Sequence, residues 1–208
     1  MSDEDPSYEP RQGLRDLTHR DADWSGLRIL VAGLGVSGFA AADALSERGA
    51  ILTAVSADAT PVISERGRIL EILDVDVRLG PEHLLELPQD TELVVTSPGF
   101  RPDHPMLLAA ASRGIPVWGE VELAWRMRAQ SGAAPWITIT GTNGKTTTVN
   151  MLASILRASG LRATSAGNVG TPLLEAVLHP EPYDVLAVEL SSFQLHWQRS
   201  VTLWPPCV

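Results

Sequence analysis

The feature that most constrains the fold of this chain is the stretch ITITGTNGKTTT at positions 137–148. Its pattern predicts a β-strand that passes through small residues into a helix. Glycines let the backbone curl so that several N–H groups face inward, and the N-terminus of the helix adds partial positive charge. Lys145, the single lysine of the sequence, lies in this turn. The stretch therefore predicts a phosphate-binding loop inside a parallel α/β domain.

Each residue type in the loop has a predicted task. Lys145 would neutralise the β- and γ-phosphates of ATP, and the Thr146 hydroxyl would hold Mg²⁺. The strict pattern G-x-x-x-x-G-K-[ST] is not met, because Ile139 stands where its first glycine belongs. The alternative is a polar turn that caps a helix with a hydroxyl. The predicted ATP-binding residues are Gly141, Thr142, Asn143, Gly144, Lys145, Thr146 and Thr147.

Hydrophobic periodicity predicts strands and helices that alternate along most of the chain, which is typical of parallel α/β folds. The predicted strands are residues 28–32, 51–55, 75–78, 93–96, 115–117, 136–139, 162–165 and 184–190. The predicted helices are residues 37–48, 61–73, 105–112, 121–128, 145–159 and 172–178. Residues 1–23 are poor in apolar side chains and are predicted to be a flexible tail.

Composition excludes several classes of function. The net charge of −9 argues against a general nucleic-acid or membrane-surface binder. No apolar run approaches the ~18 residues of a membrane span. The N-terminus is acidic and polar, unlike a signal peptide, and one cysteine cannot form an internal disulfide. We therefore expect a cytoplasmic protein.

A glycine turn follows the first predicted strand. Gly33, Gly35 and Gly38 satisfy the pattern G-x-G-x-x-G, which suggests dinucleotide binding. An acidic residue is expected at the end of the next strand, but Ser56 stands there and Asp58 comes two residues later. A nicotinamide dehydrogenase also gives no reason for a phosphate loop further along the chain. These two observations argue against NAD(P) binding at the glycine turn.

An apolar strand near the end of the chain leads into a carboxylate. Glu189 closes this strand and is followed by two serines. The carboxyl ends of parallel strands face the crevice where ligands bind. Because the phosphate loop is predicted on a strand of the same sheet, Glu189 is placed to bind Mg²⁺ directly or through water. The alternative is a glutamate that faces solvent.

The short loop T-G-T-N-G-K-T-T resembles the ATP loop of the Mur ligase family, whose members form amide bonds by activating a carboxylate with ATP. ELSSFQL, which begins at Glu189, is similar to the D-glutamate-adding branch of that family. GLGVSG at 33–38, SPGF at 97–100 with a following His-Pro, AGNVGTPL around Asn168 and GEVELAW at 119–125 agree with it. The resemblance covers about residues 26–195.

The resemblance implies a reaction in two steps. ATP phosphorylates the carboxylate of UDP-N-acetylmuramoyl-L-alanine, and the amine of D-glutamate then attacks the acyl phosphate. It implies catalytic roles for Lys145 and Glu189 and metal binding by Thr146 and Glu189. The substrate-binding residues that it implies are Val36, Ser37, Ser97, Gly99, Asn168, Ser191 and Gln194. Asp58 departs from the family, in which a basic residue near the uracil is common at this place.

The resemblance also implies a domain organisation. A Rossmann-like domain for the UDP substrate would span residues 24–129. The small and turn-prone residues of QSGAAP at 130–135 themselves predict a linker after it. Residues 136–208 would form an incomplete P-loop-type parallel α/β domain. We expect the chain to correspond to roughly the N-terminal 40–50% of a ligase, judged from domain sizes, and to be inactive alone.

The sequence lacks several features of complete family members. This sequence does not contain the third domain of the family, its histidine near a second Mg²⁺ or its carbamylated lysine. The ending TLWPPCV is also unlike the members of the family. An incomplete sheet would leave the strand at 184–190 as an exposed edge. A complete family member is expected to be a monomer. A UDP-sugar-binding module without catalysis and an NAD(P)-dependent dehydrogenase are the alternatives.

Overall fold

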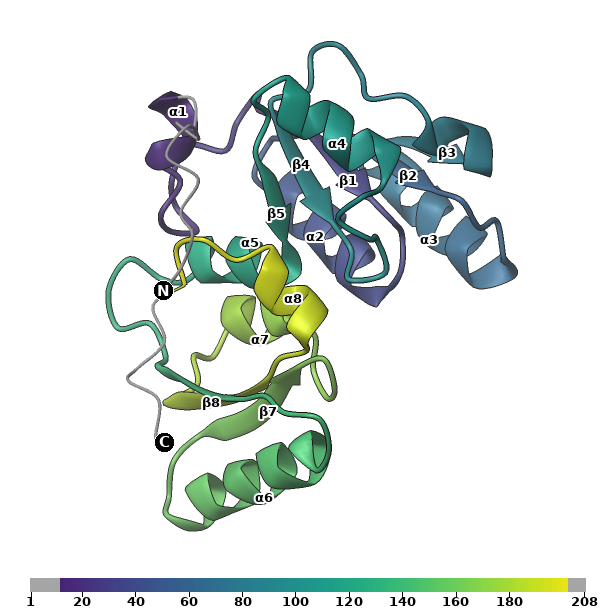
Figure 1. Ribbon diagram of the computed structural model, residues 1–208. Helices are drawn as coiled ribbons and strands as arrows, with labels where there is room; N and C mark the ends of the chain where they lie inside the picture. The colour runs from purple at the N-terminus through teal and green to yellow at the C-terminus, as the bar shows by residue number, and fades with distance from the viewer. Residues whose placement is uncertain (1–11, 202–208) are drawn as a thin grey trace.

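The computed structural model describes residues 12–201, which fold into two parallel β-sheets with helices packed on them (Figure 1). The first sheet has the strand order β3-β2-β1-β4-β5, and the second has the order β6-β8-β7. The strands are β1 Arg28–Ala32, β2 Ile51–Ser56, β3 Asp76–Leu79, β4 Leu93–Thr96, β5 Val117–Gly119, β6 Trp136–Ile139, β7 Ala163–Gly167 and β8 Val185–Glu189. Every pairing between them is parallel, which confirms the predicted α/β class.

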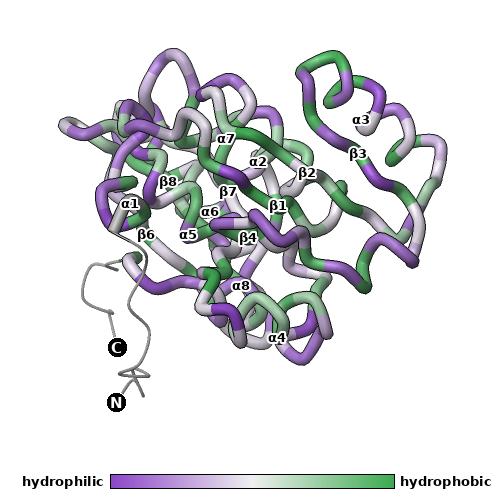
Figure 2. Tube along the Cα trace, turned by 90° about the horizontal axis from the view of Figure 1, so that it is seen from above, coloured by the Kyte–Doolittle hydropathy of each residue, from purple (hydrophilic) through white to green (hydrophobic). Residues whose placement is uncertain are grey.

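Most helices connect successive strands, whereas α1 precedes β1 and α8 follows β8. They are α1 Gln12–Arg15, α2 Val36–Ser46, α3 Pro61–Ile72, the 3-10 helix η1 Pro81–Leu84, α4 Pro105–Ser112, α5 Glu120–Arg126, α6 Lys145–Ala158, α7 Leu173–Leu178 and α8 Ser192–His196. Figure 1 shows α5, α7 and α8 between the two sheets. Figure 2 places α3 and β3 at the far end of the molecule from β6 and β8.

The order of the strands places a crevice at the carboxyl end of the first sheet and brings three strand ends together in the second. In the first sheet the chain runs from β1 outward through β2 and β3, then returns to β4 on the other side of β1. Such a reversal opens a crevice at the carboxyl ends of the two strands, here β1 and β4. In the second sheet the carboxyl ends of β6 and β7 flank that of β8.

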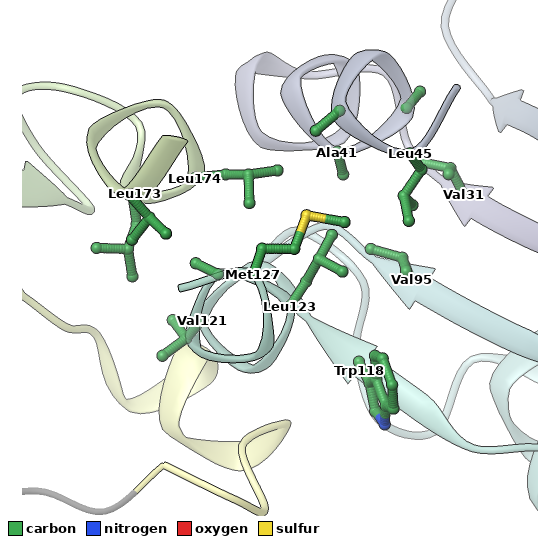
Figure 3. Close-up of a cluster of buried hydrophobic side chains, with 14 of the residues drawn as sticks. Val31, Ala41, Leu45, Val95, Trp118, Val121, Leu123, Met127, Leu173 and Leu174 are labelled. Carbon is green, nitrogen blue, oxygen red and sulfur yellow. The ribbon is translucent and has the colours of Figure 1, made fainter. Parts of the chain in front are cut away.

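One hydrophobic core connects the two sheets. Leu123 and Met127, on and just after α5, are fully buried among side chains from both halves of the chain. Figure 3 shows them between α2, which carries Ala41 and Leu45, and the start of α7. Burial of this apolar surface is the main force that holds the sheets together.

The prediction of a flexible tail over residues 1–23 is wrong for its described part, residues 12–23. Leu14 and Leu17 are 2% and 3% exposed and belong to the main core. Their carbonyl oxygens also accept hydrogen bonds from Nη1 of Arg126, at 3.3 and 3.2 Å. Two leucines in a polar stretch give little local signal, because their partners lie on α5. Residues 1–11 of the predicted tail lie outside the described part.

The prediction that the strand at 184–190 forms an exposed edge is also wrong. β8 lies in the middle of the second sheet, with β6 on one side and β7 on the other, and all of its residues are buried. The last strand in sequence is the central strand in space, because the chain crosses over the sheet before it forms β8. β6 and β7 are therefore the edge strands among the described residues.

Candidate functional site

The predicted phosphate loop joins β6 to α6. Gly144 caps the start of α6 with φ of +77°, and Gly141 has φ of +152°. These left-handed conformations favour glycine over residues that carry a Cβ. The Lys145 Nζ donates a hydrogen bond of 2.8 Å to the carbonyl oxygen of Gly141, so the side chain folds over the loop. The ammonium group and the N-terminus of α6 therefore lie together, as an anion site requires.

Three strand ends meet at Glu189, whose carboxylate closes β8 and is 1% exposed. Its Oε2 accepts a hydrogen bond of 2.9 Å from the hydroxyl of Thr146, in the first turn of α6. Its Oε1 accepts one of 3.3 Å from the Asn168 side-chain amide, just beyond β7. The alternative that Glu189 faces solvent is thereby excluded. The structure brings Thr146, Asn168 and Glu189 together from three parts of the chain.

Two glycines shape the loop that carries Asn168, which we call the Asn168 loop (residues 167–172). A Cβ on Gly167 would lie 2.3 Å from the carbonyl oxygen of Glu189, and one on Gly170 would lie 2.8 Å from that of Ser165. Both glycines also have positive φ. The Asn168 N–H donates to the carbonyl oxygen of Glu189 at 3.0 Å, so the backbone fixes the direction of its side chain.

The glycine turn that follows β1 opens onto a cavity of about 730 Å³ at the ends of β1 and β4. A Cβ on Gly38 would lie 1.7 Å from the carbonyl oxygen of Gly33, so only glycine permits this approach of α2 to the turn. The Ser97 hydroxyl donates to the same carbonyl oxygen at 3.2 Å. Four predicted substrate residues line the cavity: Val36, Ser37, Ser97 and Gly99.

The far side of this cavity carries charged and aromatic residues. Arg101 forms an exposed ion pair of 3.0 Å with Asp103, and the ring of His104 packs against Phe100 with 5.0 Å between centroids. These four residues line the cavity, as does the exposed Asp58. Sequence reasoning did not single out Arg101, although its place just after the SPGF string was a signal.

A second cleft of about 280 Å³ leads from the first cavity toward the Asn168 loop. Val36, Ser37 and Pro98 line both spaces, so the two are adjacent. Asn168 and Gln194 line the second cleft. The clefts therefore connect the glycine turn of the first sheet to the site at Glu189.

Ser191 and Gln194 form a capping box at the start of α8. The Gln194 Oε1 accepts hydrogen bonds from the backbone N–H and the hydroxyl of Ser191, at 2.9 and 3.0 Å. The Ser191 hydroxyl in turn accepts one from the Gln194 N–H. Both were predicted to contact substrate. Their side chains are occupied with each other, which gives them a structural task in this conformation.

Sequence reasoning missed Glu120, which begins α5. Its side chain is 3% exposed and accepts hydrogen bonds from the Ser37 hydroxyl and, at 2.9 Å, from the Leu173 N–H. Burial raises the pKa of Glu120, and these hydrogen bonds act against that rise. A carboxylate between apolar residues in GEVELAW was the available signal.

Glu122, also missed, is fully buried. Its Oε1 accepts a hydrogen bond of 2.6 Å from Nε of Arg126, and its Oε2 accepts bonds of 2.7 and 2.9 Å from the N–H groups of Arg199 and Ser200. Burial alone would raise the pKa of Glu122, but the bonds from Ser200, Arg199 and Arg126 together lower it. The guanidinium of Arg126 also stacks on Trp118, 4.3 Å from the ring centroid.

The described residues contain no group of three or more His, Cys, Asp or Glu side chains that could hold a metal ion. Mg²⁺ does not require one, because it is commonly bound through one or two carboxylates together with phosphate oxygens and water. The hydroxyl of Thr146 and the carboxylate of Glu189 offer hard oxygen donors of this kind. Within residues 12–201 no helix is long and apolar enough to cross a membrane.

A phosphate loop that faces a buried carboxylate, beside a glycine turn with a large cavity, is typical of nucleotide-binding α/β proteins. Family comparisons define the class further. The model of the Mur ligase MurD-like N-terminal domain matches residues 27–119, and that of the Mur ligase middle domain matches residues 139–208. The chain belongs to the Mur ligase family.

Curated relatives point to one branch of this family. The chain is 55% identical to a UDP-N-acetylmuramoylalanine–D-glutamate ligase from Streptomyces avermitilis, over 86% of this chain and 38% of the relative. The ligase of the same name from Streptomyces coelicolor is 53% identical over 86% of this chain and 38% of the relative. That from Leifsonia xyli is 49% identical over 88% and 37%. The chain thus spans less than two fifths of the length of these relatives.

Proposed function

We propose that this protein is an ATP-dependent ligase that adds D-glutamate to UDP-N-acetylmuramoyl-L-alanine in the synthesis of peptidoglycan precursors. The relatives bear the name of this activity, and the ELSSFQL string agrees with them. We propose that the reaction takes place in the cytoplasm, because nucleotide-linked substrates are made there.

We propose that the first cavity binds the UDP part of the substrate. The N-terminus of α2 and the N–H groups of Val36 and Ser37 suit the diphosphate, because a helix N-terminus attracts anions. Ser97 and Gly99 line the opposite side, where the positive charge of Arg101 is balanced by its ion pair with Asp103. Asp58 would repel an anionic group, so the uracil end of the ligand is expected near it.

The phosphate loop and Glu189 are the proposed site for ATP and Mg²⁺. When bound, ATP would supply the phosphoryl group that activates the substrate carboxylate, and Mg²⁺ would supply positive charge that screens the phosphates. Lys145 would neutralise negative charge on the phosphates. Thr146 and Glu189 would provide oxygen ligands, and Asn168 keeps the Glu189 carboxylate in orientation. The contribution of the protein is positioning and charge neutralisation.

The observation that supports this proposal most is the meeting of Thr146, Asn168 and Glu189 beside Lys145. Its test is calorimetry of the 208-residue chain with UDP-N-acetylmuramoyl-L-alanine and, separately, with a non-hydrolysable ATP analogue and Mg²⁺. We expect heat from both ligands. No heat at millimolar UDP-N-acetylmuramoyl-L-alanine would end the proposal for the first cavity.

The same preparation tests the expectation that the chain is inactive alone. D-glutamate-dependent release of ADP is measured with both substrates present. We expect none, because the relatives are more than twice as long as their aligned parts. Turnover by the purified chain would refute this expectation.

A second candidate function is a UDP-sugar-binding module without catalysis. It is favoured by the cavity of about 730 Å³, whose lining residues all belong to the first sheet and its loops and helices. This candidate predicts heat with the UDP substrate and none with the ATP analogue. Binding of both ligands would exclude it.

A further inference from the structure

Glu120 lies buried at the junction of the two sheets, where it contacts two helices that begin beside the two clefts. We propose that Glu120 is a positioning residue that couples the first cavity to the Asn168 loop. Occupancy of the cavity would thus be transmitted to the residues that hold Glu189. The proposal rests on the proposed function only for the identity of the cavity's ligand.

The first contact of Glu120 is with the glycine turn. Ser37 is the second residue of α2, and its hydroxyl donates a hydrogen bond to the Oε2 of Glu120. Ser37 also lines both clefts. Because its hydroxyl proton is committed to Glu120, only its lone pairs remain available to a ligand. A ligand that moves Ser37 must therefore act on the Glu120 carboxylate.

The second contact is with α7. The Oε1 of Glu120 accepts the hydrogen bond from the N–H of Leu173, the first residue of that helix. Pro172 precedes it and provides no side-chain cap, so Glu120 performs the capping task from another element. The start of α7 is therefore held by a side chain that also holds the glycine turn.

The Asn168 loop transmits this position to Glu189 because it is short and internally bonded. Its end adjoins Leu173, and a hydrogen bond of 3.1 Å from the Gly167 N–H to the Thr171 carbonyl oxygen joins its first residue to this end. Its start is tied to Glu189 through the backbone and the side chain of Asn168. A shift at Leu173 is therefore expected to reach Asn168.

Burial makes the coupling effective. With 3% exposure, the Glu120 carboxylate has little access to water that could replace a lost partner. An unsatisfied buried polar group is costly, so carboxylate and partners are expected to move together.

The test is a double-mutant cycle read by amide hydrogen exchange in the 208-residue chain without ligand. Exchange of the Leu173 N–H is compared in the wild type, Ser37→Ala, Glu120→Ala and the double variant. We expect Ser37→Ala to speed this exchange roughly two- to tenfold, which is the effect expected from the loss of one hydrogen bond. In the Glu120→Ala background the same change is expected to have no effect.

A purely structural role for Glu120 would not produce this dependence, since Ser37 and Leu173 lie on different elements. Glu71→Ala is the control, because Glu71 is an exposed carboxylate on α3 that contacts neither Ser37 nor Leu173. It should leave the response to Ser37→Ala intact. If Glu120→Ala does not fold, Glu120→Leu is used in its place. Leucine has a similar volume and cannot bond to Ser37 or to Leu173. Unchanged Leu173 exchange in Ser37→Ala would overturn the proposal.

A second arm adds UDP-N-acetylmuramoyl-L-alanine. We expect slower exchange at Ser37 and at Leu173 in the wild type, and at Ser37 alone in Glu120→Ala. An effect confined to Ser37 in the wild type would overturn the coupling while leaving the proposed function intact. No effect at either residue would refute the proposed ligand, and the ligand-free cycle would then decide the coupling.

Discussion

Replacing Glu122 with glutamine tests how the ends of the described chain are held to the core. Glu122 contacts Arg199 and Ser200 near one end, while its partner Arg126 holds the carbonyl oxygens of Leu14 and Leu17 near the other. This pair is buried, with side-chain exposures of 15% for Arg126 and 0% for Glu122. Glutamine preserves the shape and removes the charge and one acceptor group.

The size of the effect follows from the donors that face Glu122. Its Oε1 accepts from Nε of Arg126 and from the Ser200 hydroxyl, both at 2.6 Å. If the glutamine NH₂ group took the place of Oε1, it would face the guanidinium of Arg126, and two donors would meet. The Ser200 hydroxyl, in contrast, can rotate and accept a hydrogen bond from this NH₂ group. Breaking a buried ion pair costs about 3–5 kcal/mol. Because Arg126 keeps its bonds to the two carbonyl oxygens, we expect the lower limit, about 3 kcal/mol.

The assay is thermal unfolding followed by circular dichroism. For a domain of this size 1 kcal/mol corresponds to about 2–4 °C, so Tm should fall by about 6–12 °C. Glu65→Gln is the control, because Glu65 forms an exposed pair with Arg68 at 3.4 Å. It should change stability by less than about 0.5 kcal/mol. A loss below about 1 kcal/mol in Glu122→Gln would show that the pair does not hold these segments.

The remaining predictions concern pH, the phosphate loop and the glycine turn. The lowered pKa of Glu122 gives stability that is present above its unfolded pKa and lost as pH falls through the folded value, so Glu122→Gln should flatten the acid side of a Tm profile. The raised pKa of Glu120 acts in the opposite sense: its contribution is lost as pH rises through the folded value, and Glu120→Gln should flatten that part. Lys145→Ala should weaken binding of the ATP analogue at least about tenfold in calorimetry, because a charge-assisted bond is lost, with little change in Tm. Gly38→Ala places a Cβ 1.7 Å from a backbone oxygen, so it should destabilise the chain by about 2 kcal/mol or more in denaturant titration; an unchanged midpoint would contradict this contact.

Features set by neighbouring residues were predictable. The strand that leads into the phosphate loop, the helix that begins at Lys145 and the glycine turn at Gly33 are local patterns, and the structure contains them. Glu189 was recognised because it ends an apolar strand. The domain limits and ligand roles inferred with these features stay predictions.

Contacts between distant residues were not predictable in the same way. The sequence identified Thr146, Asn168 and Glu189 as candidates, but they meet only because β8 lies between β6 and β7. A strand signal contains no information about its neighbours in the sheet. For this reason the expectation of an exposed edge failed while the strand itself was correct.

The sequence by itself determined that the chain is a parallel α/β protein in which a glycine turn joins a strand to the helix that begins at Lys145, because strand, glycine turn and helix signals act over a few residues. Only the tertiary structure decided which groups donate hydrogen bonds to the buried carboxylates of Glu120 and Glu122. The partners of Glu120 lie 83 and 53 residues away, and those of Glu122 include groups 77 and 78 residues away. A buried charge is tolerated only where folding brings donors to it, and those donors come from segments that share no local pattern.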